Sequence, residues 1–465
     1  MIRSAVAALS SGVDPRPNDR RRHAARAAVL IGAVLVTPSV GFAQEEQQQV
    51  RPTQVHEHVA VTAPLLTPAR ETSGTAWLPQ VTPMYGLHRP WGGWDVRLNG
   101  AFFVQGVFEP RYRHRTGGSA TRQAASINWG MFTARRTLRG GRFGIRTMFS
   151  AEPWTMSGCG ALNLLATGEV CNGDSVHDRQ QPHDAFMELA VDYDRPIAAA
   201  WRWQVYGGLA GEPALGPPGY PHRASAMPNP VRPMTHHWLD STHVSLGVVT
   251  LGVHNQRWKA ELSTFNGREA DERRGDLDLG GFDSFAGRLS FLPTGRLALQ
   301  VSAARLRDVT TEFPFPSQDP VMRATTSAVY HVPFRAGVWA TTLAVGANHA
   351  RAAVSGGLLH ATSVGALLES SMTFSGRHTV FGTGEVGGMP AHHLHAHRYS
   401  TSVFAVGKLQ FGYVRQLRAR RGVVPGIGGT IAVSLLSPEL APYYTARTAP
   451  SFGVFFSLQP TKHEM

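Results

Sequence analysis

Histidine is the residue type whose spacing in this sequence most suggests chemistry. The segment MPAHHLHAHRYS, residues 389–400, holds four histidines, and MPNPVRPMTHHWLDSTH, residues 227–243, holds three. Imidazole is the commonest metal ligand near neutral pH, and the methionines of both segments add affinity for Cu(I). The candidate metal ligands are His236, His237, His392, His393, His395 and His397.

The same histidines also fit a simpler interpretation. The pairs HH and HxH are common in solvated loops, and no further ligand follows at the fixed spacing that a zinc site shows. A polar loop without metal therefore stays open. We expect no cofactor unless these loops bind copper or another transition metal. The two interpretations differ in geometry, because a metal site requires the two segments to meet.

The N-terminal residues predict export. Four arginines between residues 20 and 26 precede the apolar run 27–36, and the small residues Gly41 and Ala43 follow. A basic region, a short apolar region and small residues describe a signal peptide, so residues 1–43 are expected to be removed. A short buried helix is the alternative. Residues 44–92 are expected to form a flexible leader, and residues 93–465 the folded domain.

Charged residues are sparse in this chain. They make up 17% of its 465 residues, with a formal net charge of +13, whereas an ordinary soluble domain has about 25%. Arginine is spread along the chain instead of forming one basic patch, which argues against nucleic-acid binding. Sequence signatures of a nucleophile elbow, a phosphate-binding loop and a dinucleotide site do not occur, so an enzyme is not expected.

From Trp94 onward, apolar and polar residues alternate with a period of two. In SFGVFFSLQ, residues 451–459, every second residue from Phe452 to Leu458 is apolar. Such alternation predicts a half-buried strand. No later segment approaches the roughly 20 apolar residues of a membrane helix. An exported chain of this kind that crosses a membrane must therefore cross it as a closed β-barrel.

The alternation predicts an all-β protein, a transmembrane antiparallel up-and-down β-barrel of about 16 strands, within about 14–18. Short connectors such as 139–141 alternate with long ones such as 212–240, which is typical of outer-membrane barrels. A soluble all-β protein, such as a propeller or a large sandwich, is the alternative, but the propeller repeat of about 40 to 50 residues is not found, and a soluble sheet would carry more charge on its exposed face. The expected strands are 94–108, 124–138, 142–152, 184–193, 201–211, 241–253, 258–266, 282–292, 296–306, 324–332, 336–347, 359–374, 378–386, 399–416, 428–436 and 450–459.

A barrel of this size leaves a lumen, toward which the alternation points polar side chains. Arginines on a pore wall create a positive field that favours anions. Alternatively, they pair with lumen carboxylates such as Glu261 and are simply part of the wall. The expected pore-lining residues are Arg142, Arg146, Arg202, Gln204, Arg288 and Gln300.

The chain has two cysteines, Cys159 and Cys171, and both fall in one expected long loop. In an exported protein a local disulfide is the natural interpretation. The CxxC spacing that is typical of metal and redox sites is absent.

The alternating pattern over residues 94–459 resembles that of bacterial outer-membrane β-barrel proteins of the porin-like kind. The final strand, SFGVFFSLQP, looks like the aromatic C-terminal strand that such proteins present for assembly, although TKHEM follows it here. The stretches at 73–86 and 177–190 are similar to a porin-like group from environmental bacteria, from which no activity carries over. The resemblance implies a location in the outer membrane of a Gram-negative bacterium.

The expected function is passive passage of small polar solutes, with anions as the narrower expectation. Two alternatives stay open: a surface metal-binding protein related to copper, and a structural barrel with a closed lumen. The expected partners are outer-membrane lipid, the barrel-assembly machinery and small solutes, without nucleic acid. A homo-oligomer also stays open.

Overall fold

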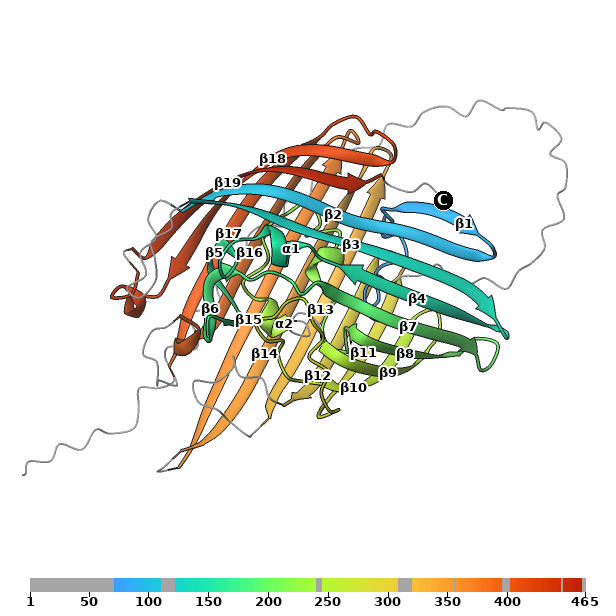
Figure 1. Ribbon diagram of the computed structural model, residues 1–465, viewed down its shortest axis with the longest axis horizontal. Coiled ribbons are helices and arrows are strands. Elements are labelled where there is room, and N and C mark those ends of the chain that lie inside the picture. Colours follow the sequence, from blue (N-terminus) through green and yellow to red (C-terminus); the bar gives the residue numbers. More distant parts are fainter. Residues whose placement is uncertain are drawn as a thin grey trace, which may run out of the picture. The chain divides into compact units, whose positions relative to one another are not determined.

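Sixteen antiparallel strands form a closed barrel among the described residues of this computed structural model (Figure 1). The structure describes residues 71–109, 122–239, 245–307, 320–354, 357–394, 402–444 and 446–461. The barrel strands are β2 (Trp94–Phe108), β3 (Arg122–Leu138), β4 (Gly141–Phe149), β7 (Phe186–Pro196), β8 (Arg202–Gly211), β9 (Ser245–His254), β10 (Trp258–Asn266), β11 (Ser284–Thr294), β12 (Leu297–Leu306), β13 (Val321–Phe334), β14 (Gly337–Val354), β15 (Gly357–Phe374), β16 (His378–Pro390), β17 (Val403–Gln416), β18 (Val423–Leu436) and β19 (Thr448–Pro460).

The remaining elements are short. A strand β1 forms a hairpin with β2, and β5 and β6 form a separate hairpin between β4 and β7. Among the described residues, no helix has the length and the apolar character that a membrane-spanning helix needs. These shorter elements are β1 (Leu87–Trp91), α1 (Glu152–Thr155), β5 (Ala161–Cys171), β6 (Asp174–Gln180), η1 (Tyr220–His222), α2 (His236–Leu239), η3 (Ala391–Leu394) and η4 (Pro438–Leu440).

The barrel closes where the last strand pairs with the first. β19 runs antiparallel to β2, from Phe452 opposite Phe108 to Leu458 opposite Phe102. This pairing leaves no open edge in the wall, as a structure surrounded by lipid requires. The predicted fold class is confirmed. The bounds expected at 94–108 and 258–266 coincide with those of β2 and β10.

The two faces of the wall differ in polarity. Along β13, buried and exposed residues alternate strictly from Val321 to Thr326. The exposed outer positions include large apolar side chains, such as Leu262, which is 73% exposed, and Val454, which is 70% exposed. The buried inner positions carry charged and hydroxyl groups. An apolar outer face with a polar inner face is the pattern of a transmembrane barrel.

The connections are short at one rim and long at the other. Tight turns include Arg139-Gly140 between β3 and β4, where both residues have positive φ, as a two-residue hairpin of this twist requires. The longest connections are residues 150–185, which carry the β5–β6 hairpin, and the segment that follows β8. The expected disulfide joins Cys159 to Cys171, with a Cα–Cα distance of 5.7 Å.

The expected flexible leader differs from the structure over residues 71–92. Residues 71–78 are buried or half-buried, and β1 pairs with β2 at the short-turn rim. The prediction of a flexible leader was based on the polar composition of this region. Polar residues suit exposure to water, but they equally suit contact with the charged groups inside the barrel. Residues 1–70, which include the expected signal peptide, lie outside the described residues.

A charge on the outer face should destabilise the barrel in a way that depends on depth. We expect Leu262→Arg, in the middle of β10, to lower the free energy of unfolding in phospholipid vesicles by about 2–4 kcal/mol. The matched control is Trp91→Arg at the tip of the β1–β2 hairpin, with an expected loss of about 0–1 kcal/mol. Urea titration would measure both values, and equal losses would contradict a lipid-facing Leu262.

Candidate functional site

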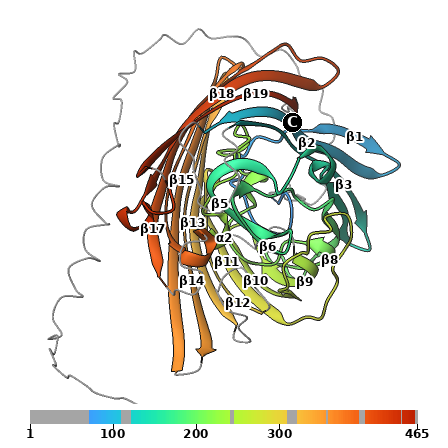
Figure 2. The ribbon, with the colours of Figure 1, turned by 60° about the vertical axis from the view of Figure 1, so that its left-hand side comes forward.

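Two segments of the chain fold into the barrel and, with its inner wall, form the candidate site. The N-terminal segment comprises residues 71–82, and the inner loop comprises residues 212–239 between β8 and β9. Residues 213–239 are buried or half-buried throughout. Figure 2 shows α2, at the end of the inner loop, within the ring of strands. The free space inside the barrel therefore depends on how these two segments are held.

The N-terminal segment is anchored by the carboxylate of Glu71. Lys259 Nζ donates to Glu71 Oε1 at 2.5 Å, while Arg146 Nη2 and Gln204 Nε2 donate to Oε2 at 3.3 and 3.1 Å. These donors come from β10, β4 and β8. Burial alone would raise the pKa of Glu71, but the charges of Lys259 and Arg146 outweigh it and hold the pKa far below its ordinary value.

Arg146 and Lys259 also bind the backbone of this segment, and Arg288 of β11 binds one of its hydroxyl groups. Arg146 Nη1 donates to the carbonyl of Thr72 at 3.1 Å and also to that of Gly74. Lys259 Nζ donates to the Thr75 carbonyl at 2.7 Å, and Arg288 Nη2 donates to the Thr75 hydroxyl at 2.9 Å. The wall therefore holds both the carboxylate and the peptide groups of the N-terminal segment.

The six expected pore-lining residues all lie on barrel strands. Arg146 pairs with Asp192 as well as Glu71, Arg202 pairs with Asp194, and Arg288 pairs with Glu261 at 3.0 Å. These pairs match the alternative in which wall arginines meet lumen carboxylates. Gln204 donates a hydrogen bond to Glu71, and Gln300 donates one to Thr325 at 3.1 Å. Arg142 is half-buried.

The inner loop crosses the barrel interior. Near its start, Ala214 N–H donates to Ser263 of β10 at 2.8 Å. In its middle, Arg223 forms a two-point ion pair with Glu369 of β15, at 2.5 and 3.0 Å. Near its end, the backbone and hydroxyl of Thr235 donate to Glu385 of β16, at 2.9 and 2.8 Å. Because the loop is bonded to strands that lie far apart around the ring, it occupies part of the barrel interior.

Sequence reasoning missed the residues that anchor the inner loop. Glu369 and Glu385 are the carboxylates that hold it, and both are buried. Each is an isolated charge within a strand of small and apolar residues, at a position that alternates with lipid-facing side chains. That combination was a usable signal, since a lone inward charge in a barrel strand requires a partner inside.

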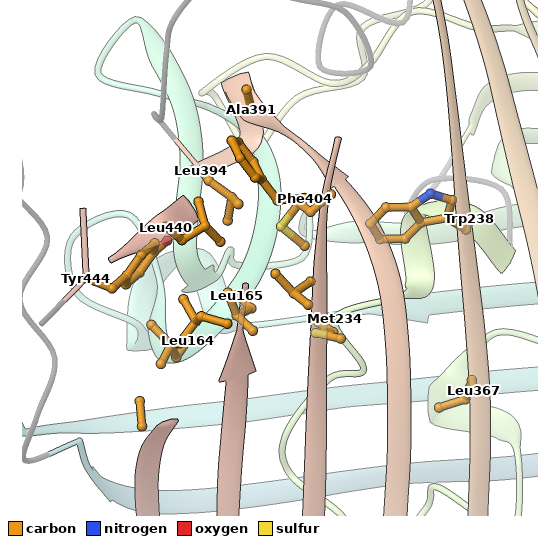
Figure 3. Packing of buried hydrophobic residues seen from close by; sticks show 14 of the residues in the cluster. Leu164, Leu165, Met234, Trp238, Leu367, Ala391, Leu394, Phe404, Leu440 and Tyr444 are labelled. Carbon is orange, nitrogen blue, oxygen red and sulfur yellow. The ribbon is translucent and has the colours of Figure 1, made fainter. Parts of the chain in front are cut away.

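A buried apolar cluster fixes the far end of the inner loop (Figure 3). Met234 and Trp238 pack there with Leu164 and Leu165 of the β5–β6 hairpin. The indole N–H of Trp238 donates to Ser363 Oγ at 2.8 Å. Glycine is required on the facing strands: a Cβ at Gly346 would lie 1.8 Å from the Trp238 carbonyl, and one at Gly365 would lie 2.9 Å from the indole. The wall is therefore shaped to accept this side chain.

The histidines predicted as metal ligands are only partly brought together. His236 and His237 lie in α2, where they bond the carbonyls of Pro233 at 3.0 Å and Thr167 at 3.1 Å. His393, in η3, is buried and close enough to act on His237 electrostatically. His395, His397 and the side chain of His392 lie outside the described residues.

No described histidine belongs to a cluster with metal-binding geometry. Among the described residues, three ligand atoms within 4.8 Å of one another occur at Asp271, Asp276 and Asp278. These aspartates stand in the loop after β10, away from the sequence positions predicted to bind metal. The hypothesis of a histidine metal site therefore stays a prediction.

Burial keeps the histidines of the inner loop neutral. Burial, with the charge of Arg146, lowers the pKa of His222 to about 3. Burial also lowers the pKa of His236 and of His237 well below the ordinary value, and the neighbouring imidazoles and cations lower it further. In the unfolded chain each pKa is about 6.5. Their contribution to stability is therefore complete above about pH 6.5 and is lost as the pH falls below it.

Replacing His222 should remove part of this pH dependence. His222→Phe keeps an aromatic ring against Trp129, whose centroid lies 4.8 Å from the imidazole. Below about pH 6, the free energy of unfolding of the native protein should fall more steeply than that of the variant, by about 1.4 kcal/mol per pH unit. Denaturant titrations over a pH series measure this difference. Above about pH 7.5 the difference should be constant, and parallel profiles throughout would contradict a buried neutral His222.

No protein-family model matches the chain, and no curated protein matches it. Its fold is similar to that of several solved barrels. The outer membrane channel DcaP of Acinetobacter baumannii is 8% identical, with 81% of this chain and 100% of that chain covered and a TM-score of 0.47. An anion-selective porin from Comamonas acidovorans is 11% identical, with 79% of this chain and 99% of that chain covered and a TM-score of 0.44. OprB of Pseudomonas putida is 8% identical, with 79% of this chain and 94% of that chain covered and a TM-score of 0.48. The similarity to these proteins is one of fold.

Proposed function

We propose that this protein is a porin-like channel for small polar solutes in the outer membrane of a Gram-negative bacterium. The observation that carries the proposal is the closed sixteen-strand wall, with apolar side chains outside and charged side chains inside. Such a wall suits lipid on one side and water on the other. A barrel of sixteen strands is also wider than its own wall side chains can fill.

The N-terminal segment and the inner loop, which are inserted into the barrel, favour a passage that is narrow. The inner loop is bonded to strands across the barrel, and the N-terminal segment lies against the wall from β4 to β11. Both segments take up part of the cross-section, and the inner wall beside them carries charged and hydroxyl groups. Passage is therefore limited to small solutes that tolerate a polar path.

A preference for anions is the narrower proposal. Arg135 of β3 supports it, because this buried guanidinium makes no hydrogen bond or ion pair with any residue that the structure describes. Arg146, Arg202 and Arg288 pair with carboxylates, which cancels much of their field. The preference is therefore weak while both inserted segments are in place.

Purified protein in planar lipid bilayers tests the proposed function. A channel gives stepwise conductance increments, and the reversal potential under a salt gradient gives the selectivity between ions. A barrel that is folded, as shown by its β-sheet circular dichroism, but electrically silent would overturn the proposal and favour a structural barrel.

Releasing the middle of the inner loop should widen the passage. Arg223→Ala removes one partner of a buried ion pair and leaves the Glu369 carboxylate with the hydroxyl of Ser225, at 2.7 Å. Breaking such a pair costs about 3–5 kcal/mol of anchoring free energy. We therefore expect larger conductance steps than those of the native protein.

The matched control for this variant is Arg273→Ala. Arg273 pairs with Asp271 on an exterior loop, and its side chain is 75% exposed. Because exposed ion pairs contribute little, the conductance of this control should equal that of the native protein. If Arg223→Ala also leaves the step size unchanged, the inner loop does not limit the passage.

A further inference from the structure

The carboxylate of Glu71 is bound in the manner of a ligand. It is buried, and both of its oxygens accept hydrogen bonds from side chains of three different strands. A cation on each side and an amide is a donor set suited to a carboxylate. Yet Glu71 belongs to the N-terminal segment, which lies inside the barrel and is not one of the strands of its wall. The wall therefore carries a preformed anion site whose present occupant comes from the same chain.

The wall keeps a positive excess at this position without Glu71. If Glu71 is withdrawn, Arg146 keeps its ion pair with Asp192, at 3.0 Å, and Lys259 keeps its ion pair with Glu261, at 3.1 Å. Beside them Arg135 is only 7% exposed and makes no hydrogen bond or ion pair with any described residue.

The pairing of β3 with β4 brings these cations together. Arg135 stands opposite Gly144, between the inward positions of Arg142 and Arg146. Arg135 is close enough to both of these arginines for their like charges to repel it, and close enough to Asp192 and Glu71 to be attracted by them. Withdrawal of Glu71 would leave this group of cations without one of its few carboxylates, at a place shielded from bulk water.

We propose that Arg146, Gln204 and Lys259, with Arg135 beside them, form a binding subsite for the carboxylate group of a small solute. Glu71 fills the subsite when the N-terminal segment is in place, and the carboxylate of a solute replaces it when the segment withdraws. A singly charged group with two oxygens fits, since Glu71 satisfies the donors with that charge and shape. The proposal deepens the proposed channel function and rests on it for the route of the solute, but the binding itself needs no transport.

Competition with the tethered carboxylate sets the conditions for a test. A group held on the same chain acts at an effective concentration in the millimolar range or above. A free acid therefore binds the native protein poorly and must be tried where Glu71 is removed. Glu71→Ala deletes two carbon atoms and both oxygens, which is the size and charge of acetate.

Acetate should therefore rescue Glu71→Ala. In detergent at constant ionic strength, we expect replacement of chloride by about 0.1 M acetate to raise the midpoint of thermal unfolding of the variant by about 2 °C. The native protein, whose subsite is filled, should not respond. The double variant Glu71→Ala/Lys259→Gln should also lose the response, because a main donor to the carboxylate is gone.

Glu212→Ala is the matched control. Glu212 holds the same segment by accepting from the Ser73 hydroxyl at 2.5 Å. Its loss loosens the segment without uncovering the wall cations, so acetate should not raise its midpoint. An equal response in Glu212→Ala and Glu71→Ala, or none in a cooperatively unfolding Glu71→Ala, would overturn the subsite.

A second variant covers the case in which Glu71→Ala does not fold. Glu71→Gln keeps the shape of the side chain and removes its charge, so the ratio of anion to cation permeability in bilayers should rise at least about twofold over the native value. An unchanged ratio would count against the subsite. The two proposals can also fail separately: acetate rescue in an electrically silent barrel would sustain only the subsite, and conductance without rescue only the channel.

Discussion

The backbone hydrogen bonds between neighbouring strands are the interaction on which the rest of this structure depends. Lipid offers no partner for an open strand edge, so the wall must return on itself, and it does so where β19 pairs with β2. Once the ring is closed, alternation assigns every second side chain to lipid and the others to the interior. Because the ring is too wide for these side chains to fill, the interior can receive other parts of the chain.

The inserted segments are held by charge and shape together. Buried ion pairs such as Arg223 with Glu369 are weak evidence for stability, since the cost of removing both charges from water offsets their attraction. Such a pair fixes the position of the inner loop, because its two parallel hydrogen bonds form in only one relative orientation of the guanidinium and the carboxylate. Trp238 adds the apolar counterpart, in a recess that only glycine at 346 and 365 leaves open.

The wall could be predicted from the sequence, but its contents could not. A strand of nine residues such as β10 reveals itself by a local period of two, and pairing with its chain neighbours follows from the short turns. The contact of Glu71 with Lys259 joins residues 188 positions apart, and no local pattern encodes it. The arginines expected to line the pore lie on barrel strands, but their partners Glu71, Asp192 and Asp194 were not foreseen, so the sequence could not tell an open anion path from a paired one.

The position of the inner loop in the chain has a consequence for the order of folding. Asn229 exchanges hydrogen bonds with Gln410 of β17, 181 residues later, and Thr235 binds Glu385 of β16, 150 residues later. These partners do not exist in place until most of the wall has been built. Docking of the loop therefore depends on contacts between residues far apart in the sequence, which are slow to form because the entropy of closing a long stretch of chain is lost before the contacts are gained. Only nine of the 28 residues of the loop are polar or charged, and those that anchor it, such as Arg223, Asn229 and Thr235, find their partners inside the finished ring.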